Sequence, residues 1–255
     1  MNILCIGDVT GSIGCRFLRE HLSALKKEKR IDLVIVNGEN SADGNGITPD
    51  SAEFLFSSGA DVITTGNHCF QRREVYDLMD REEYLLRPAN HSPKTPGHGF
   101  CIVDKGRIQI AVINLMGTLY LDALENPFDR MDLILKEDLP KIRILDFHAE
   151  TTSEKRAMGF YLDGRISAMF GTHTHVQTSD IQILPNGTGY ITDLGMTGPV
   201  NSVIGFEKEP VIHKFTTDLP VRVGFAEGPC LMEGAVFSID EKTGKTVSCE
   251  AIRIK

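Results

Sequence analysis

The chain has 255 residues, with 27 basic and 35 acidic side chains and a formal net charge of −8 at pH 7. Hydrophobic residues make up 41% and charged residues 24%, which is the balance of an ordinary globular protein. No apolar run is long enough to cross a membrane, no basic leader opens the sequence, and the acidic balance disfavours an extended contact with a nucleic-acid backbone. We expect one domain over residues 1–255.

The six cysteines are scattered through the chain and form no C-x-x-C pair. This arrangement disfavours both a zinc ribbon and a disulfide framework, and it is typical of a reducing compartment. We therefore expect the protein in the cytoplasm. A phosphate-bearing small molecule is still compatible with the negative charge, because bound metal ions supply positive charge locally.

The first eighty residues alternate short apolar runs with stretches of helical spacing. Strands are expected at 2–6, 33–36 and 62–65, and helices at 15–29, 48–58 and 73–80. Because such an alternation produces right-handed crossovers, it predicts a largely parallel sheet.

From residue 99 the pattern changes. Runs at 99–104 and 107–114 predict a β-hairpin, and the polar and aromatic insertion 116–130 is a candidate lid or oligomer contact. Ser153 is the expected N-cap of its helix. The remaining expected elements are helices at 131–139 and 153–162, strands at 142–147 and 166–170, and antiparallel strands at 181–184, 189–192, 221–225, 230–239 and 246–254.

Two histidines, His173 and His175, follow the apolar run 166–170. On an extended segment, residues two apart project to the same side, so both imidazoles would face one point or two adjacent points. Imidazole is a common ligand for transition metals. Taken alone the pair is weak evidence, since hydrogen-bonded structural histidines at strand ends are common.

Polar residues suited to metal binding follow five of the expected strands. They are Asp8, Glu39 with Asn40, Asn67 with His68, His148, and His173 with His175. In an open α/β sheet the carboxyl ends of the strands meet at one crevice, so these groups are expected to converge. Individually they have structural explanations, such as helix capping by Asp8 or a core position for His148. Together they suit two metal ions that share a bridging carboxylate.

Longer motifs carry a resemblance to a known family. Short motifs at the same five places resemble those of the calcineurin-like metallophosphoesterases. The stretches 37–42, 146–155, 171–178 and 190–199 look like the YmdB-like branch of that superfamily. The resemblance covers essentially the whole chain, and it implies an α/β fold with two mixed sheets flanked by helices, a four-layer αββα sandwich.

The resemblance also implies a dinuclear metal site, with Glu39 as the bridging ligand. One ion is assigned to Asp8, Glu39, Asn40 and His175, and the other to Glu39, Asn67, His148 and His173. His68 corresponds to the unliganded histidine near the substrate phosphate. Iron or manganese is the expected metal, and zinc also suits mixed nitrogen and oxygen ligands.

The activity implied by the resemblance is that of a phosphodiesterase acting on 2',3'-cyclic nucleotides such as 2',3'-cAMP. In this hypothesis a metal-activated hydroxide attacks phosphorus, and His68 protonates the leaving alkoxide or stabilises charge on the phosphoryl oxygens. Two alternatives stay open: a broader phosphatase or nucleotidase, and a metal-bound regulatory protein that acts through partners. The expected partner is a small phosphodiester, and homo-oligomerisation is left open.

The chain departs from the superfamily pattern in three places. Thr10 stands where an additional histidine ligand is usual, so Asn40 is the expected replacement. Glu39 stands where the bridging ligand is usually aspartate. The segment 69–71 reads Cys-Phe-Gln where relatives commonly carry an aromatic and an acidic residue, which leaves the packing around His68 open. Four further histidines (His21, His91, His98 and His213) have no partner motif and are not expected to bind metal.

Overall fold

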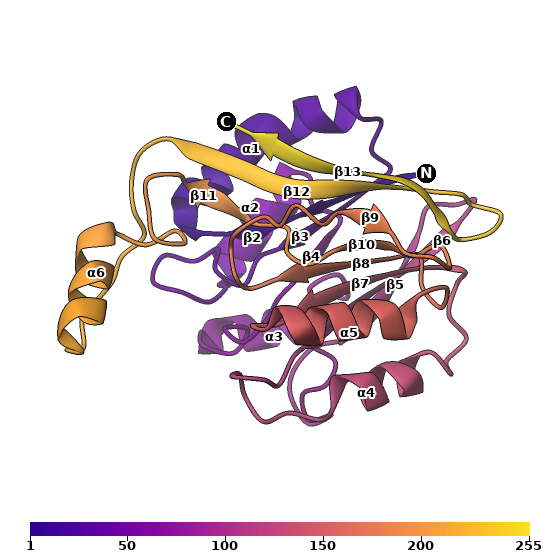
Figure 1. Cartoon of the computed structure of the whole chain (residues 1–255), viewed down its shortest axis with the longest axis horizontal. Helices are drawn as coiled ribbons and strands as arrows, with labels where there is room; N and C mark the ends of the chain where they lie inside the picture. Colours follow the sequence, from indigo (N-terminus) through magenta and orange to yellow (C-terminus); the bar gives the residue numbers. More distant parts are fainter.

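The computed structural model describes residues 1–255, and in it two β-sheets pack face to face with helices on their outer faces (Figure 1). In spatial order, the first sheet holds β2 (Asp8–Val9), β11 (Met196–Pro199), β12 (Cys230–Ile239), β1 (Asn2–Ile6), β3 (Leu33–Asn37) and β4 (Val62–Thr64), with β13 (Thr246–Ile254) paired to β12. The second sheet holds β5 (Phe100–Asp104), β6 (Gln109–Met116), β7 (Ile142–His148), β8 (Ala168–Thr172), β10 (Gly189–Ile191) and β9 (Gln182–Ile183).

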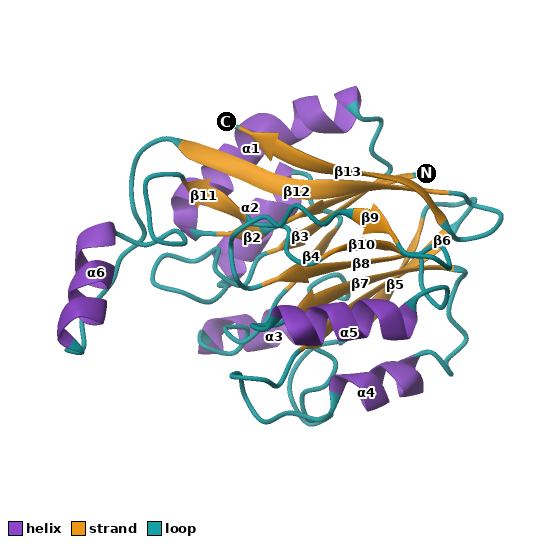
Figure 2. Cartoon of the chain, viewed as in Figure 1, coloured by secondary structure: helices purple, strands orange, loops and turns teal.

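Two pairs of helices form the two outer layers of the molecule (Figure 2). Helices α1 (Gly11–Glu28) and α2 (Pro49–Ser58) pack against the first sheet, and α4 (Pro127–Ile134) and α5 (Thr152–Leu162) against the second. A short η1 (Arg73–Val75) leads into α3 (Tyr76–Arg81). The expected four-layer αββα sandwich of two mixed sheets is therefore confirmed. No helix is both long and apolar enough to cross a membrane.

Successive side chains of a central strand pack into different cores, one on each face of the sheet. In β1, Leu4 and Ile6 pack into the core beneath α1 and α2, whereas Ile3 and Cys5 face the second sheet. Since successive side chains of a strand point to opposite faces, a continuous apolar run is what a strand buried on both sides requires. The run Asn2–Ile6 is such a strand, and it was expected at the same residues.

Helix α2 also forms where the sequence predicts it. Thr48 caps it by accepting a hydrogen bond from the Ser51 backbone N–H, and the Ser51 hydroxyl accepts one from the Thr48 N–H. Pro49 occupies the first turn, where a missing N–H costs no helical bond. The helix ends at Gly59, whose φ of 112° suits glycine.

The starts of three helices differ from expectation. Helix α1 begins at Gly11, not at residue 15, because the Asp43 carboxylate caps it from a distant loop by accepting the Ser12 N–H at 2.8 Å. Helix α4 covers Pro127–Ile134 in place of 131–139, since the Asn126 side chain accepts the Phe128 N–H. The N-cap of α5 is Thr151, which accepts the Glu154 N–H, and not Ser153.

The C-terminal third departs further from the expected row of antiparallel strands. Strand β10 runs parallel to β8, and β11 was not expected at all. Segment 221–225 is not a strand, because only Phe225 bridges to another residue, Phe206. Helix α6 (Lys208–Thr217) was also missed. It buries none of its residues and stands away from the sandwich (Figure 1), so no packed face marks it in the sequence.

Removing the α2 cap tests this account of local folding. Thr48→Ala should lower the free energy of unfolding by about 1 kcal/mol, because the Ser51 N–H loses its acceptor. The measurement is the urea midpoint, with Thr48→Ser as the matched control that keeps the hydroxyl. An alanine variant with the midpoint of the native protein would contradict the assignment.

Candidate metal centre

The space between the two sheets changes from apolar to polar at the carboxyl ends of the strands. Along each central strand the positions that face the other sheet are first occupied by residues such as Ile35 and Ile144. The same faces then end in fully buried polar residues: Asn37 on β3, Thr64 on β4, Asp146 and His148 on β7, and Thr172 on β8. This buried polar layer forms the floor of the candidate site.

Asp146 lies at the centre of the polar layer. Its carboxylate accepts hydrogen bonds from Asn37 Nδ2 at 3.1 Å, from Thr172 Oγ1 at 2.7 Å and from the Thr64 hydroxyl. Burial raises the pKa of Asp146 to about 6, although the hydrogen bonds lower it because they favour the charged carboxylate. Because the Thr172 hydroxyl donates to Asp146, it accepts from His148 Nδ1 at 2.9 Å. The other ring nitrogen of His148, Nε2, takes no part in this network and is the atom that could bind a metal.

The first donor group gathers around His148 Nε2. This nitrogen lies 3.2 Å from Glu39 Oε1, 2.9 Å from Asn67 Oδ1 and 3.0 Å from His173 Nδ1. The ligand atoms of Glu39, His148 and His173 all lie within 4.8 Å of one another. One carboxylate, one amide and two imidazoles thus converge on a small volume, which is a donor set suited to a transition metal.

The second donor group gathers around His175. Its Nε2 lies 3.6 Å from Asp8 Oδ1 and 3.3 Å from the Asn40 side-chain amide, and that amide lies 3.1 Å from Glu39 Oε1. Asp8 Oδ1 is fully buried and has no hydrogen-bond partner. A buried carboxylate oxygen without a donor is costly unless a cation lies next to it, so this group fits a metal ion. Glu39 contacts both donor groups.

A second contact orients each of the three histidine rings. His148 Nδ1 lies against Thr172, His173 Nε2 is 2.8 Å from Glu150 Oε2, and His175 Nδ1 is 2.8 Å from the Ile204 carbonyl. Partners of this kind fix the tautomer and the ring direction of metal-ligating histidines. Sequence reasoning missed all three. Glu150 could have been found two residues after His148, whereas nothing local marks Ile204.

Without a metal, protons balance the charges of the two donor groups. Burial opposes charge on His175, but the Asp8 carboxylate outweighs it and raises the pKa to about 9. The pKa of His148 is also raised, because Glu39 outweighs burial, and the pKa values of both carboxyls are lowered by their histidines in spite of burial. Burial and the neighbouring His148 lower the pKa of His173. The site is therefore built to hold positive charge.

The sequence predicts an extended segment for His173 and His175, and this prediction is wrong. Strand β8 ends at Thr172, and His173 and His175 have φ values of 99° and 61°. Left-handed backbone of this kind costs non-glycine residues about 1–3 kcal/mol each. The turn sends His173 to the Glu39 and His148 group and His175 to the Asp8 group, so the two rings do not face one point.

His68 lies at the half-buried edge of the same cluster. Its backbone N–H donates to Glu39 Oε2 at 3.1 Å, and its ring contacts the side-chain amides of Gln71, at 2.6 Å from Nδ1, and Asn67, at 3.4 Å from Nε2. Gln71 is thus the side-chain neighbour of Nδ1 of this ring. Thr10 takes no part, because its hydroxyl donates to the Thr197 carbonyl at 3.2 Å.

Residues beside the site have structural contacts instead of free donors. The guanidinium of Arg72 donates to the carbonyls of Asp43, Gly44 and Asn45, so it anchors the loop after β3. Among the other histidines, His91 lies edge-on against the Phe70 ring. Neither Arg72 nor His91 contributes a ligand atom to the two donor groups.

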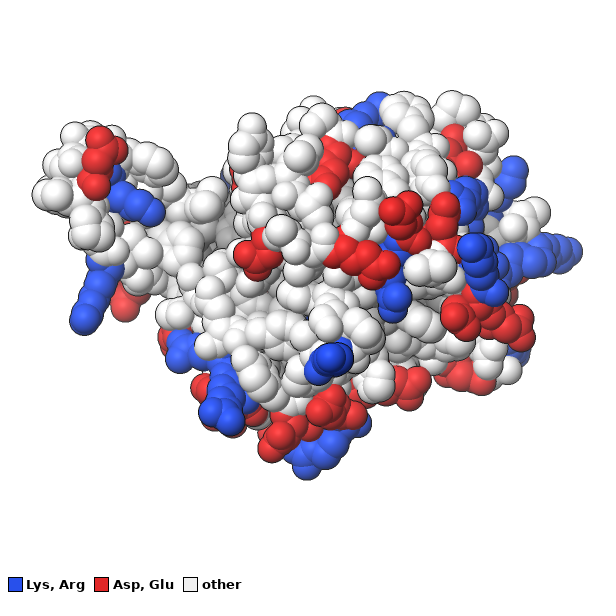
Figure 3. All heavy atoms as spheres, turned by 90° about the horizontal axis from the view of Figure 1, so that it is seen from below, with Lys and Arg blue, Asp and Glu red and all other residues white.

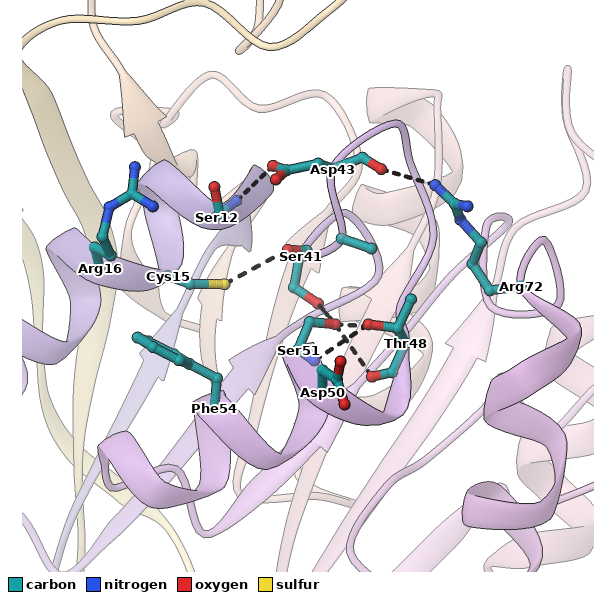
Figure 4. Close-up of a pocket in the computed structure, with 11 residues that line it drawn as sticks. Ser12, Cys15, Arg16, Ser41, Asp43, Thr48, Asp50, Ser51, Phe54 and Arg72 are labelled. Atoms are coloured by element: carbon teal, nitrogen blue, oxygen red, sulfur yellow. Dashed lines mark hydrogen bonds between the residues drawn. The ribbon is translucent and has the colours of Figure 1, made fainter.

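A cavity of about 380 Å³ opens between α1 and α2, next to the loop that carries Asn40 (Figure 4). Its hydroxyls bond to one another, with Ser41 donating to Ser51 at 2.8 Å, and the Cys15 thiol contacts the Ser41 carbonyl at 3.6 Å. Burial raises the pKa of Cys15 to about 12, which keeps the thiol protonated. The Cys15 thiol is therefore not an activated nucleophile.

The fold and the convergent donors define a protein of the metallophosphoesterase fold. A Thermus thermophilus sulfate thiohydrolase, SoxB, shares this fold with a TM-score of 0.55 at 11% identity, over 98% of this chain and 43% of the SoxB chain. The model of the YmdB-like protein family matches residues 4–252. The chain belongs to that family.

Similar proteins at higher identity cover the whole chain. The 2',3'-cyclic-nucleotide 2'-phosphodiesterase of Bacillus subtilis is 46% identical over 256 residues, which are 100% of this chain and 97% of the relative. A Thermus thermophilus protein without a stated activity superposes with a TM-score of 0.95 at 39% identity, over 100% of this chain and 99% of the other. A Mycoplasma pneumoniae protein described as a novel phosphatase has a TM-score of 0.95 at 35% identity, over 100% and 93%.

The stability of the metal-free protein should depend on the proton of His175. The raised pKa means that the folded state favours the charged ring. The charged ring therefore contributes fully to the free energy of unfolding below the ordinary pKa of 6.5, and this contribution is lost as the pH rises through about 9. We expect a loss of about 3 kcal/mol between these limits. Urea unfolding in the presence of a chelator measures it.

His175→Gln is the matched control for this pH dependence. In the variant, the free energy of unfolding should not show the decrease between pH 6.5 and about 9 that loss of the His175 proton causes in the native protein. If the native protein and the variant lose stability equally over that range, the predicted Asp8–His175 pairing is wrong.

Proposed function

We propose that this protein is a dinuclear metal-dependent phosphodiesterase that hydrolyses 2',3'-cyclic nucleotides. The observation that carries the proposal is the pair of donor groups that share Glu39, one of which includes the buried Asp8 oxygen without a partner. Two adjacent cation sites are what in-line attack on a phosphate ester uses. The substrate class is supported by the name of the Bacillus subtilis relative, which is 46% identical to this chain.

The two donor groups would hold the two ions. Asp8, Asn40 and His175 would bind one ion, and Asn67, His148 and His173 the other, with Glu39 between them. Bound ions would supply positive charge for the phosphodiester and lower the pKa of coordinated water. Iron or manganese is the proposed metal, and zinc suits the same donors.

His68 is the proposed catalytic residue. Its ring lies next to Asn67 and is held from the other side by Gln71, and its backbone N–H contacts Glu39. This placement puts an imidazole beside the donor groups without making it part of either. From there His68 would donate a proton to the leaving alkoxide or a hydrogen bond to the phosphoryl oxygens.

A small substrate fits the surface charge. On the face shown in Figure 3, acidic and basic side chains are interspersed, and the middle of the face is mostly uncharged. The formal charge of the whole chain is −8. Since binding to a nucleic-acid backbone depends on neutralising many phosphates, we propose a small phosphodiester substrate in place of an extended strand.

Two classes of variant should separate catalysis from metal binding. His68→Ala should lower kcat by about 10²–10⁴-fold and retain the metal, because only the proton donor is removed. Asp8→Ala and His175→Ala should lose both metal and activity. The measurements are metal content by mass spectrometry and hydrolysis of 2',3'-cAMP. Full activity in protein stripped of metal would refute the mechanism.

The substrate class is tested on the purified native protein. We expect 2',3'-cyclic nucleotides to be cleaved with a higher kcat/KM than 3',5'-cyclic nucleotides or nucleoside monophosphates. The second candidate is a broader phosphatase, which the description of the Mycoplasma pneumoniae structure favours. A preference for monoesters on the same panel would select it.

A further inference from the structure

Lys155 and Asp193 form a buried ion pair outside the two donor groups. The ammonium and carboxylate are 2.7 Å apart, and their side chains are 1% and 0% exposed. Lys155 lies on α5 and Asp193 follows β10, so the pair joins an outer helix to a strand end. Charges are rarely buried this completely, because desolvation offsets much of the Coulomb attraction. Neither residue takes part in the proposed chemistry.

Two further contacts of the Asp193 carboxylate reach the turn that carries His173 and His175. Its Oδ2 accepts the Thr174 backbone N–H at 3.2 Å and the Thr174 hydroxyl at 2.7 Å, and its Oδ1 accepts the Gly195 N–H at 2.9 Å. Thr174 is the residue between His173 and His175. The carboxylate therefore holds the middle of the turn through two hydrogen bonds, while Lys155 compensates its charge.

The turn needs such an anchor. Both flanking histidines adopt left-handed backbone, and such conformations persist only where the surrounding structure enforces them. Gly171, two residues before His173, is closely packed at this point. A Cβ there would overlap the Thr192 carbonyl and would lie 2.9 Å from Lys155 Cδ, so glycine leaves room for both.

We propose that Asp193, neutralised by Lys155, is a positioning residue that holds Thr174 and so directs the His173 and His175 rings toward two different donor groups. The part that concerns metal affinity rests on the proposed function. The part that concerns ring placement does not, because the two imidazoles diverge from this turn in the metal-free structure.

Thr174→Val is the principal test, because it removes one hydrogen bond and leaves the ion pair intact. In metal-free protein labelled with ¹³C-histidine, the ring signals of His173 and His175 should shift or broaden, and those of His21 and His91 should stay unchanged. Thr174→Ser, which keeps a hydroxyl, should retain the native signals. Thr188→Val, which removes a different buried hydroxyl, controls for general loss of stability.

Asp193→Asn and Lys155→Met extend the test to the pair itself. Both should change the same two ring signals more strongly than Thr174→Val does. Native ring signals in Thr174→Val, or a lower Tm in the pair variants with native ring signals, would overturn the proposal and assign the pair to core stability alone. If the pair variants do not fold, Thr174→Val decides.

Metal affinity is measured separately, by competition between the protein and a chelator for Mn²⁺. Thr174→Val should raise the Kd about 10–100-fold, as expected when a group that orients metal ligands is removed. An unchanged Kd in a variant with displaced rings would overturn the link between ring direction and metal binding. A native protein that binds no Mn²⁺ and cleaves no phosphodiester would refute the proposed function, and the ring signals would still decide the positioning role.

Discussion

The hydrogen bonds that fill the acceptors of Asp146 are the constraint on which the site depends. A carboxylate enclosed between two sheets is tolerated only when its oxygens are occupied. Here the donors come from both sheets, Asn37 and Thr64 from the first and Thr172 from the second. The interaction therefore fixes how the carboxyl ends of the two sheets meet. Because Asn37 Oδ1 also accepts the Glu39 N–H, the same network places the proposed bridging ligand.

Strands and loops contribute different residues to the site. The polar floor belongs to strands, where pleating fixes side-chain direction, whereas His173 and His175 lie just beyond the end of β8. Loops allow the backbone conformations that a strand forbids, but they then need anchors from elsewhere in the fold. The carboxylate of Asp193 and the Ile204 carbonyl supply such anchors.

Family membership and geometry support different parts of the proposed function. The relationship to a named cyclic-nucleotide phosphodiesterase supports the substrate class, which nothing in the donor groups specifies. The geometry supports the metal chemistry, since the orphaned oxygen of Asp8 and the shared contacts of Glu39 are properties of this chain. The proposed role of His68 rests on the geometry alone, because its ring borders the donor groups.

The sequence by itself determined the features that a short-range pattern of residues encodes. These are the strands at 2–6, 230–239 and 246–254, the capped helix α2, and polar residues at five strand ends. The family resemblance already implied that His173 and His175 divide between two ions, but only the tertiary structure supplied the left-handed turn that separates their rings and decided that Asp43 starts α1. It also decided that β10 lies parallel to β8 and that Lys155 meets Asp193. These features join segments that are distant in the chain, so no local spacing or propensity records them.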